Sequence, residues 1–169
     1  TVPNRQVLEK YLGAAPYIVK PAKGEKGKGI ELLETFEQVA EKLGDHPSDW
    51  VIQTYIPNEG DYRVMVYGYE VRGALYRQAA DGLVVNNTSQ GGSSSYLKAE
   101  SVPQQVSKMA VMAARAVEHA VAGVDVVTDS TGIAYVFEVN QGSQIVTGHF
   151  TDKKIMAFGE YLSERTETR

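Results

Sequence analysis

Two apolar runs separated by a short polar turn place the strongest constraint on the fold of this chain. Residues 123–129 read GVDVVTD, residues 133–139 read IAYVFEV, and only Ser130, Thr131 and Gly132 lie between them. Runs rich in valine, isoleucine and aromatic residues on either side of such a turn predict an antiparallel β-hairpin. An isolated hairpin is marginally stable, so we expect this one to belong to a larger sheet that helices cover.

The register of this hairpin decides where its polar side chains lie. Glu138 and Asn140 are two residues apart in the second strand and therefore leave the same face, whereas Val139 leaves the other. A two-residue turn places Asp125 directly opposite Glu138, and a four-residue loop places Asp125 opposite Val136, one pleat repeat away. Any loop with an even number of residues thus gathers Asp125, Glu138 and Asn140 on one face.

Two carboxylates gathered on one face repel each other unless a cation lies between them. Carboxylate and amide oxygens, without histidine or cysteine, suit magnesium or manganese, which complete their coordination with water and phosphate oxygens. Asp125, Glu138 and Asn140 are therefore candidate metal ligands. The alternative is a strand that turns polar simply because it ends in solvent.

A second candidate site is the segment VKPAKGEKGKGI, residues 19–30. It holds three glycines among four lysines, and backbone N–H groups of glycine together with lysine charge suit a polyphosphate. The segment has no Gly-Lys-Ser/Thr sequence and follows an expected helix, so it is not a Walker loop. The alternative is a basic surface turn. Combined with a magnesium site, the loop suggests a nucleotide held between two lobes.

The remaining pattern predicts an α+β protein of two lobes, with mixed or antiparallel sheets and flanking helices. The expected helices are residues 4–12, 36–44, 102–121 and 153–165. The expected strands, besides the hairpin, are residues 15–21, 29–35, 50–56, 61–68 and 69–77. The segment 80–96 is rich in Asn, Ser and Gly and is expected to be a long loop.

Composition excludes several classes of protein. No stretch is apolar for the eighteen or so residues that a membrane span requires, and there is no cysteine, so we expect a soluble, cytoplasmic protein. The formal charge of −4 disfavours a general nucleic-acid binder, although ten tyrosines would permit a β domain that stacks bases. The three histidines show no ligand spacing and receive no role. The start on Thr1, directly before an expected helix, suggests a segment of a longer protein.

In this order along nearly the whole chain, the segments VKPAKGEKGKGI, VIQTYI, GDYRVMVYG, ALYR, NNTSQGG, GVDVV and FEVN resemble those of the ATP-grasp enzymes. Within that superfamily the chain is most similar to the RimK-like carboxylate–amine ligases. The resemblance implies a small lobe with the glycine-rich flap at residues 1–52 and a large lobe with the metal site at residues 53–169. It also implies a further N-terminal domain of the same protein, which this chain lacks.

The resemblance assigns roles to individual residues. Those implied to bind the nucleotide are Lys20, Gly24, Lys26, Gly27, Lys28, Gly29, Gln53, Thr54, Tyr55, Ile56, Asp61 and Asn87. Arg63 and Arg77 resemble basic groups on the phosphate and acylphosphate side, and ordinary strand-face cations are the alternative for both. The implied metal ligands are again Asp125, Glu138 and Asn140. After FEVN the family often has a Pro-Gly turn where this chain reads QGSQIVTG, so contacts to the amine substrate are left unassigned there.

The implied activity is ATP- and magnesium- or manganese-dependent ligation of a carboxylate to an amine through an acylphosphate. The amine would be an amino acid or a peptide, and the expected partners include neither nucleic acid nor a membrane. The alternative is a non-catalytic ATP-binding module with a regulatory or scaffolding role.

Overall fold

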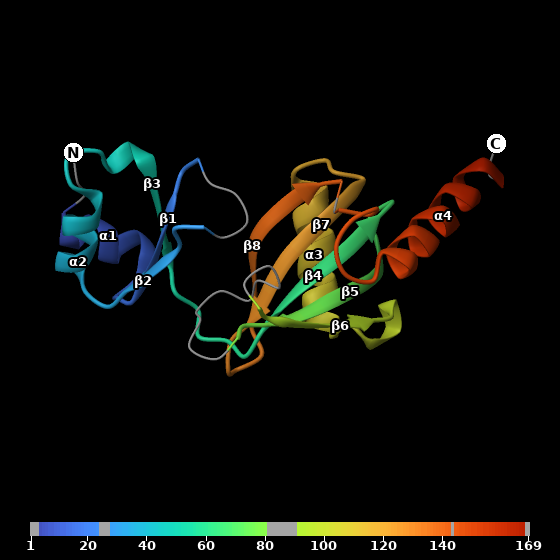
Figure 1. Cartoon of the computed structure of the whole chain (residues 1–169), viewed down its shortest axis with the longest axis horizontal. Helices are drawn as coiled ribbons and strands as arrows, with labels where there is room; N and C mark the ends of the chain where they lie inside the picture. Colours follow the sequence, from blue (N-terminus) through green and yellow to red (C-terminus); the bar gives the residue numbers. More distant parts are fainter. Residues whose placement is uncertain (1–3, 24–27, 81–90, 143, 168–169) are drawn as a thin grey trace.

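The computed structural model describes residues 4–23, 28–80, 91–142 and 144–167. Its strands form two antiparallel sheets, a three-stranded sheet of order β2-β1-β3 and a five-stranded sheet of order β6-β5-β4-β7-β8 (Figure 1). Helices flank both sheets, which confirms the α+β class. In Figure 1 the three-stranded sheet lies between its own helices and the five-stranded sheet. Among the described residues, no helix is long and apolar enough to span a bilayer.

The smaller sheet and two helices share one apolar core. Their elements are α1 (Arg5–Leu12), β1 (Tyr17–Pro21), β2 (Glu31–Leu33), α2 (Phe36–Leu43) and β3 (Trp50–Thr54). Asn4 caps α1 by accepting a hydrogen bond from the N–H of Val7, and Thr35 forms a capping box with Gln38 at α2. The core cluster comprises Leu8, Tyr17, Val19, Val39 and Leu43.

The larger sheet buries one face against a single helix. Its strands are β4 (Asp61–Tyr67), β5 (Glu70–Gln78), β6 (Ser93–Leu97), β7 (Val121–Thr128) and β8 (Ala134–Gln141), and the covering helix is α3 (Gln104–Ala116). Val64, Ala74 and Val124 pack with Val106 and Ala110 of α3, all of them fully buried. The expected helix extended to residue 121, but α3 ends at Ala116, residues 117–120 form a turn, and Val121 begins β7.

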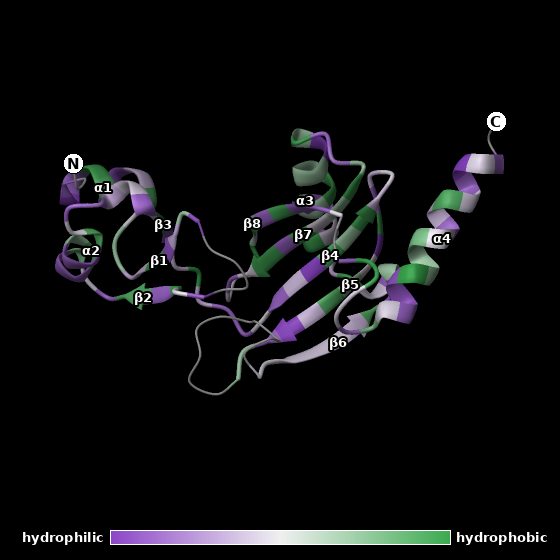
Figure 2. Ribbon diagram, turned by 45° about the horizontal axis from the view of Figure 1, so that its top comes forward, coloured by the Kyte–Doolittle hydropathy of each residue, from purple (hydrophilic) through white to green (hydrophobic). Residues whose placement is uncertain are grey.

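The opposite face of this sheet is divided between an apolar half and a polar half. Helix α4 (Thr151–Glu167) covers Met65 and Tyr67 of β4 with Ala157 and Tyr161. Because strand residues alternate between faces, Asp61 and Arg63 share this face with Met65 and Tyr67, toward the start of β4. In Figure 2 the start of β4 and the end of β5 lie side by side and are coloured as hydrophilic. The polar half is therefore the part of the face that α4 leaves open.

Strand β6 corrects the expectation of a loop over residues 80–96. Residues 93–97, SSSYL, pair antiparallel with β5, with Arg77 opposite Ser94 and Leu75 opposite Tyr96. The three consecutive serines carry no apolar alternation, and a strand at the edge of a sheet does not require one. The remainder of that segment, residues 81–90, lies outside the described residues.

The loop between β7 and β8 differs from both predicted turns. It covers residues 129–133, an odd number, which by itself would place Asp125 opposite Phe137. A bulge between Asp125 and Val126 makes Phe137 an extra residue and restores the pairing of Asp125 with Glu138. Asp129 holds the loop by accepting hydrogen bonds from the N–H groups of Thr131 (2.8 Å) and Ile133 (3.0 Å). Of the two pairings that the sequence left open, Asp125 with Glu138 is the one present, but it arises through a bulge rather than an even turn.

A second bulge, in β5, aims an arginine at α4. The register shifts between Met65 and Val66 of β4, which leaves Arg72 as the extra residue before Gly73. Arg72 donates two hydrogen bonds to Glu164 of α4, at 2.7 and 2.6 Å. Gly73 has φ +145°, and a Cβ there would lie 2.9 Å from the Tyr96 hydroxyl and 3.0 Å from the Leu97 carbonyl oxygen. The bulge thus depends on glycine.

We expect Gly73→Ala to lower the free energy of unfolding by about 1–3 kcal/mol, because the new methyl group meets backbone in a conformation unsuited to L-residues. Urea unfolding measures the loss. The control is Gly159→Ala, where α4 has nothing within 4 Å of the added Cβ; there the helix should be unchanged or gain up to about 1 kcal/mol. Equal stabilities for the two variants would contradict this account of the bulge.

Candidate functional site

Two arginines and two aspartates form an ion-pair network on the polar half of the larger sheet. Arg63 donates to Asp125 through Nε (2.8 Å) and Nη2 (2.6 Å). Arg77 donates to Asp61 through Nε (2.8 Å) and also through Nη2, which lies 3.2 Å from Oδ1 of Asp125. The register explains the grouping, because β4 places Asp61 opposite Arg77 and Arg63 opposite Asp125. These arginines are therefore oriented groups rather than free strand-face cations.

Burial governs the electrostatics of this network. Asp61 and Asp125 are each only 6% exposed. Burial raises the pKa of Asp61, while hydrogen bonding to Arg77 acts in the opposite direction. Burial alone would lower the pKa of Arg77, but its hydrogen bonds to Asp61 and the charges of Asp61 and Asp125 raise it above the ordinary value. Arg77 therefore keeps its positive charge next to any anion that binds here.

The three predicted metal ligands lie on one face of the β7–β8 hairpin. Asp125 is directly opposite Glu138, and Asn140 is opposite Gly123, which has no side chain to crowd it. Glu138 is exposed, and Nδ2 of Asn140 is buried without a hydrogen-bond partner within the described part of the chain. The oxygen donors fit a hard divalent cation, but Arg63 occupies the Asp125 carboxylate. Among described His, Cys, Asp and Glu residues, no group of three could hold a metal by itself.

The predicted nucleotide positions fall on the smaller sheet. Lys20 and Gln53 share the face of β1 and β3 opposite the buried Tyr17 and Val19, since Ile18 pairs with Gln53. Thr54 lies on the helix face instead, where its hydroxyl donates to the Leu12 carbonyl at 2.7 Å. The threonine side chain is therefore occupied by structure, and only its backbone is available to a ligand.

The backbone of β3 has one open edge within the described sheet. Two hydrogen bonds extend the pairing of β3 with β1 beyond the strand ends. The N–H of Tyr55 donates to the Pro16 carbonyl (3.3 Å), and the N–H of Ala22 donates to the Asp49 carbonyl (2.7 Å). Because backbone groups alternate in an antiparallel pair, those of Ile52 and Thr54 point to the other edge. The carbonyl of Ile56 accepts a hydrogen bond from Asn58 at 2.8 Å. An adenine needs one donor and one acceptor on a common edge, and this edge offers both kinds of group.

Part of the predicted glycine loop can be placed. Lys28 and Gly29 lie in an exposed turn. Gly29 has φ +73°, and a Cβ there would lie 3.0 Å from Cγ of Pro21, so this position favours glycine. The predicted positions that lie outside the described residues are Gly24, Lys26, Gly27 and Asn87.

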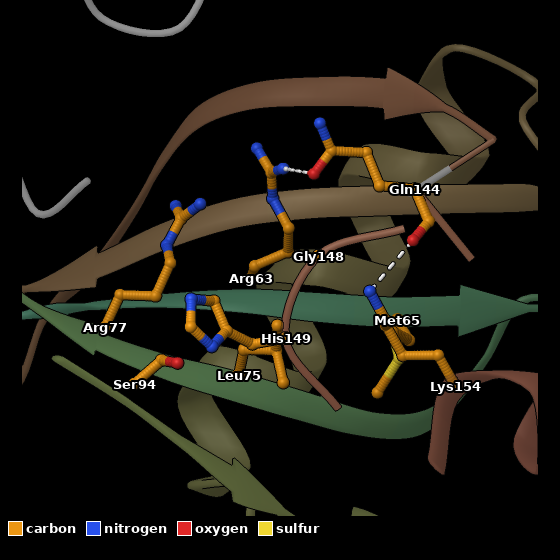
Figure 3. A pocket seen from close by; sticks show the side chains of 9 residues that line it. All are labelled: Arg63, Met65, Leu75, Arg77, Ser94, Gln144, Gly148, His149 and Lys154. Carbon is orange, nitrogen blue, oxygen red and sulfur yellow. Dashed lines mark hydrogen bonds between the residues drawn. The ribbon is translucent and has the colours of Figure 1, made fainter. Parts of the chain in front are cut away.

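A small cavity of about 60 Å³ adjoins the arginines and includes residues that the sequence reasoning missed (Figure 3). Gln144, His149 and Lys154 line it together with Arg63 and Arg77. Nη1 of Arg63 donates to Oε1 of Gln144 at 3.3 Å. The sequence reasoning assigned no role to His149. The burial of Lys154 could have been predicted, because its spacing places it on the same helix face as the buried Ala157 and Tyr161.

Comparison with protein families decides the affiliation of the chain. The family model described as the RimK-like ATP-grasp domain matches residues 2–158. The chain belongs to this family. The predicted resemblance and the ATP-grasp fold are thereby confirmed, and the polar half of the larger sheet is a candidate site within a RimK-like ATP-grasp domain.

Curated relatives carry the name probable alpha-L-glutamate ligase. The protein from Vibrio cholerae serotype O1 is 35% identical over 170 residues, which cover 94% of this chain and 55% of the relative. The protein from Marinobacter nauticus is 33% identical over 178 residues, covering 98% of this chain and 58% of the relative. The RimK-like chain thus spans a little over half the length of these relatives.

Solved structures share the fold at lower sequence identity. D-alanine–D-alanine ligase from Bacillus anthracis, complexed with ATP, has a TM-score of 0.66 and 20% identity, covering 99% of this chain and 58% of that one. The ATP-grasp ligase PsnB, complexed with a minimal precursor, has a TM-score of 0.63 and 19% identity, covering 100% of this chain and 53% of that one.

Proposed function

We propose that this RimK-like domain is the nucleotide- and metal-binding part of an ATP-dependent carboxylate–amine ligase. The observation that carries the proposal is the grouping of Asp125, Glu138 and Asn140 beside two oriented arginines. The proposal includes a small lobe at residues 1–52, a large lobe at residues 53–169 and an additional N-terminal domain. It also includes a cytoplasmic location, which the cysteine-free sequence favours.

Asp125, Glu138 and Asn140 would hold magnesium or manganese, whose charge offsets that of the ATP phosphates and orients them when it is bound. A PsnB structure complexed with Mg and ADP supports a divalent cation in this fold. In our proposal the carboxylate of Asp125 is shared with Arg63 or released by it when the metal binds. The observed ion pair keeps the buried carboxylate compensated until then.

The chain's own residues would position the reactants and balance charge. A substrate carboxylate oxygen attacks the γ-phosphorus of ATP, which gives an acylphosphate and ADP; the amine then attacks the acyl carbon, giving the amide with release of phosphate and a proton. Arg63 and Arg77 would face the transferred phosphoryl group, where fixed guanidinium groups stabilise the developing negative charge. Lys20 and the residue 24–29 flap would bind the phosphates, and the backbone near Gln53–Ile56 would bind adenine.

The name of the relatives makes glutamate the first substrate to test. The test is ADP formation by the intact protein with glutamate in the presence of hydroxylamine, which traps an acylphosphate as a hydroxamate. We expect ADP and hydroxamate in equal amounts, dependent on both ATP and divalent metal. ATP binding without ADP formation over a panel of acids and amines would favour the non-catalytic ATP-binding module instead.

Lys20 gives a separate test of the nucleotide site. We expect Lys20→Met to weaken binding of a non-hydrolysable ATP analogue by about tenfold or more, because one phosphate-facing charge is lost. Isothermal titration calorimetry measures the affinity. Lys108→Met, at an exposed position on α3, is the control and should bind as the wild type does. Unchanged affinity in Lys20→Met would remove Lys20 from the phosphate site.

A further inference from the structure

Lys154 is a buried cation at the edge of the candidate site. The residue is 3% exposed, and its side chain comes from the first turn of α4. Its Nζ donates to the carbonyl of Gln144 at 2.9 Å and to the carbonyl of Thr147. Both acceptors lie in the segment between β8 and α4, so the ammonium ties this segment to the first turn of α4. An ammonium has three donors, so one N–H remains beyond these two bonds.

The charge of Lys154 has no counter-charge among the described residues. The two guanidinium groups of the site are balanced by Asp61 and Asp125, whereas no carboxylate of the described chain forms an ion pair with Lys154. Burial, followed by the positive charge of Arg63, lowers the pKa of Lys154. Burying an unpaired charge is costly, so an anion that entered here would be strongly favoured.

The cavity next to Lys154 matches a small anionic group. Ser94, His149 and Gly148 line it with the ammonium, and its volume is about 60 Å³. That space accommodates a carboxylate and the atom that carries it. In Figure 3 the imidazole of His149 is turned toward the side of the cavity where the arginines lie. The phosphoryl group of the proposed reaction would lie on that side, and Lys154 lies away from it, toward α4.

We propose that Lys154 binds a substrate carboxylate that does not react. This inference rests on the proposed ligase function and adds to it a second anion site, distinct from the position of the acylphosphate. It restricts one substrate to compounds with a carboxylate besides the reacting group. Lys154 is a binding residue in this scheme and takes no part in bond making.

The test compares L-glutamate with its two amides, glutamine and isoglutamine, each of which lacks one carboxylate. In the wild type we expect one amide to bind at least about tenfold more weakly than glutamate. Lys154→Met should abolish this discrimination while binding of that amide is retained, and the KM for ATP should not change. Lys153→Met, at the exposed neighbour on α4, should discriminate as the wild type does.

Two readouts separate this inference from the proposed function. Calorimetric binding of glutamate and its amides needs no turnover, so it tests the anion site even where no ADP forms. Conversely, ADP formation with full discrimination in Lys154→Met would support the ligase and overturn the anion site. Equal weakening of glutamate and both amides in Lys154→Met would show a purely structural lysine, and failure of the wild type to bind glutamate would also overturn the inference.

Discussion

Replacing Glu138 by glutamine is expected to abolish metal-dependent nucleotide binding and to reduce turnover by at least about 100-fold. Glutamine keeps the size and one carbonyl oxygen of the side chain but removes the negative charge that a hard divalent cation requires. Glu138 is exposed and lies opposite Asp125, so its replacement removes a carboxylate without leaving a cavity. Thermal unfolding should therefore be unchanged or slightly improved, because like-charge repulsion with Asp125 is relieved.

Calorimetric titration of a non-hydrolysable ATP analogue, with and without magnesium, measures the effect. Glu41→Gln, at an exposed position on α2, serves as the control for removal of a surface carboxylate. The metal assignment predicts that magnesium strengthens binding in the wild type and in Glu41→Gln but not in Glu138→Gln. Retention of full magnesium-dependent binding and turnover by Glu138→Gln would refute the assignment.

Replacing Arg77 by methionine is expected to cost about 3 kcal/mol or more of unfolding free energy and to remove activity. The side chains of Arg77 and Asp61 are only 14% and 9% exposed, so the substitution leaves a buried carboxylate without its partner. Asp125 retains Arg63, and Asp61 has no equivalent second partner within hydrogen-bond distance among the described residues. The stability loss thus comes mainly from Asp61.

The double variant Asp61→Asn with Arg77→Met distinguishes stability from catalysis. It should recover a large part of the unfolding free energy measured in urea, since no charge remains uncompensated, and it should stay inactive because the guanidinium is absent. Recovery of turnover together with stability would show that Arg77 acts only through the fold.

The pH dependence of Arg77→Met has a definite sign. Burial already raises the pKa of Asp61, and loss of Arg77 removes the hydrogen bond and the charge that most oppose this rise. A carboxyl whose folded-state pKa lies above its unfolded value binds protons more readily when folded. The variant's deficit in unfolding free energy should therefore be smallest below the unfolded pKa and grow as pH rises through the folded one. A deficit that is constant with pH would place its origin elsewhere.

Local patterns were sufficient for most elements of secondary structure. The first two helices begin within one residue of their predicted starts, where Asn4 and Thr35 cap them, because a capping interaction spans only three residues. The antiparallel pairing of the two strands, with Asp125 and Glu138 on one face, was also predictable, since two strands joined by a short loop must pair antiparallel. The bulge at Phe137 was not predictable. Asp129 stabilises a loop with an odd number of residues, and the extra residue in β8 is needed to place Asp125 opposite Glu138.

Edge strand β6 shows where local pattern reasoning stops. Its serines carry no signal of their own, and the strand exists because β5 offers unpaired backbone groups at the edge of the sheet. The same limit applies to Arg72, which resembles any strand cation until a bulge directs it to Glu164.

The sequence by itself determined the α+β class and the order of the segments that mark the RimK-like family, and it named the candidate residues for binding a cation or phosphate. These features depend on residue type, spacing and neighbouring residues. The tertiary structure decided that Arg63 and Arg77 are paired with Asp125 and Asp61, and that Lys154 is a buried cation beside them. Such partnerships join residues far apart in the chain, so their geometry is set by sheet register and helix packing.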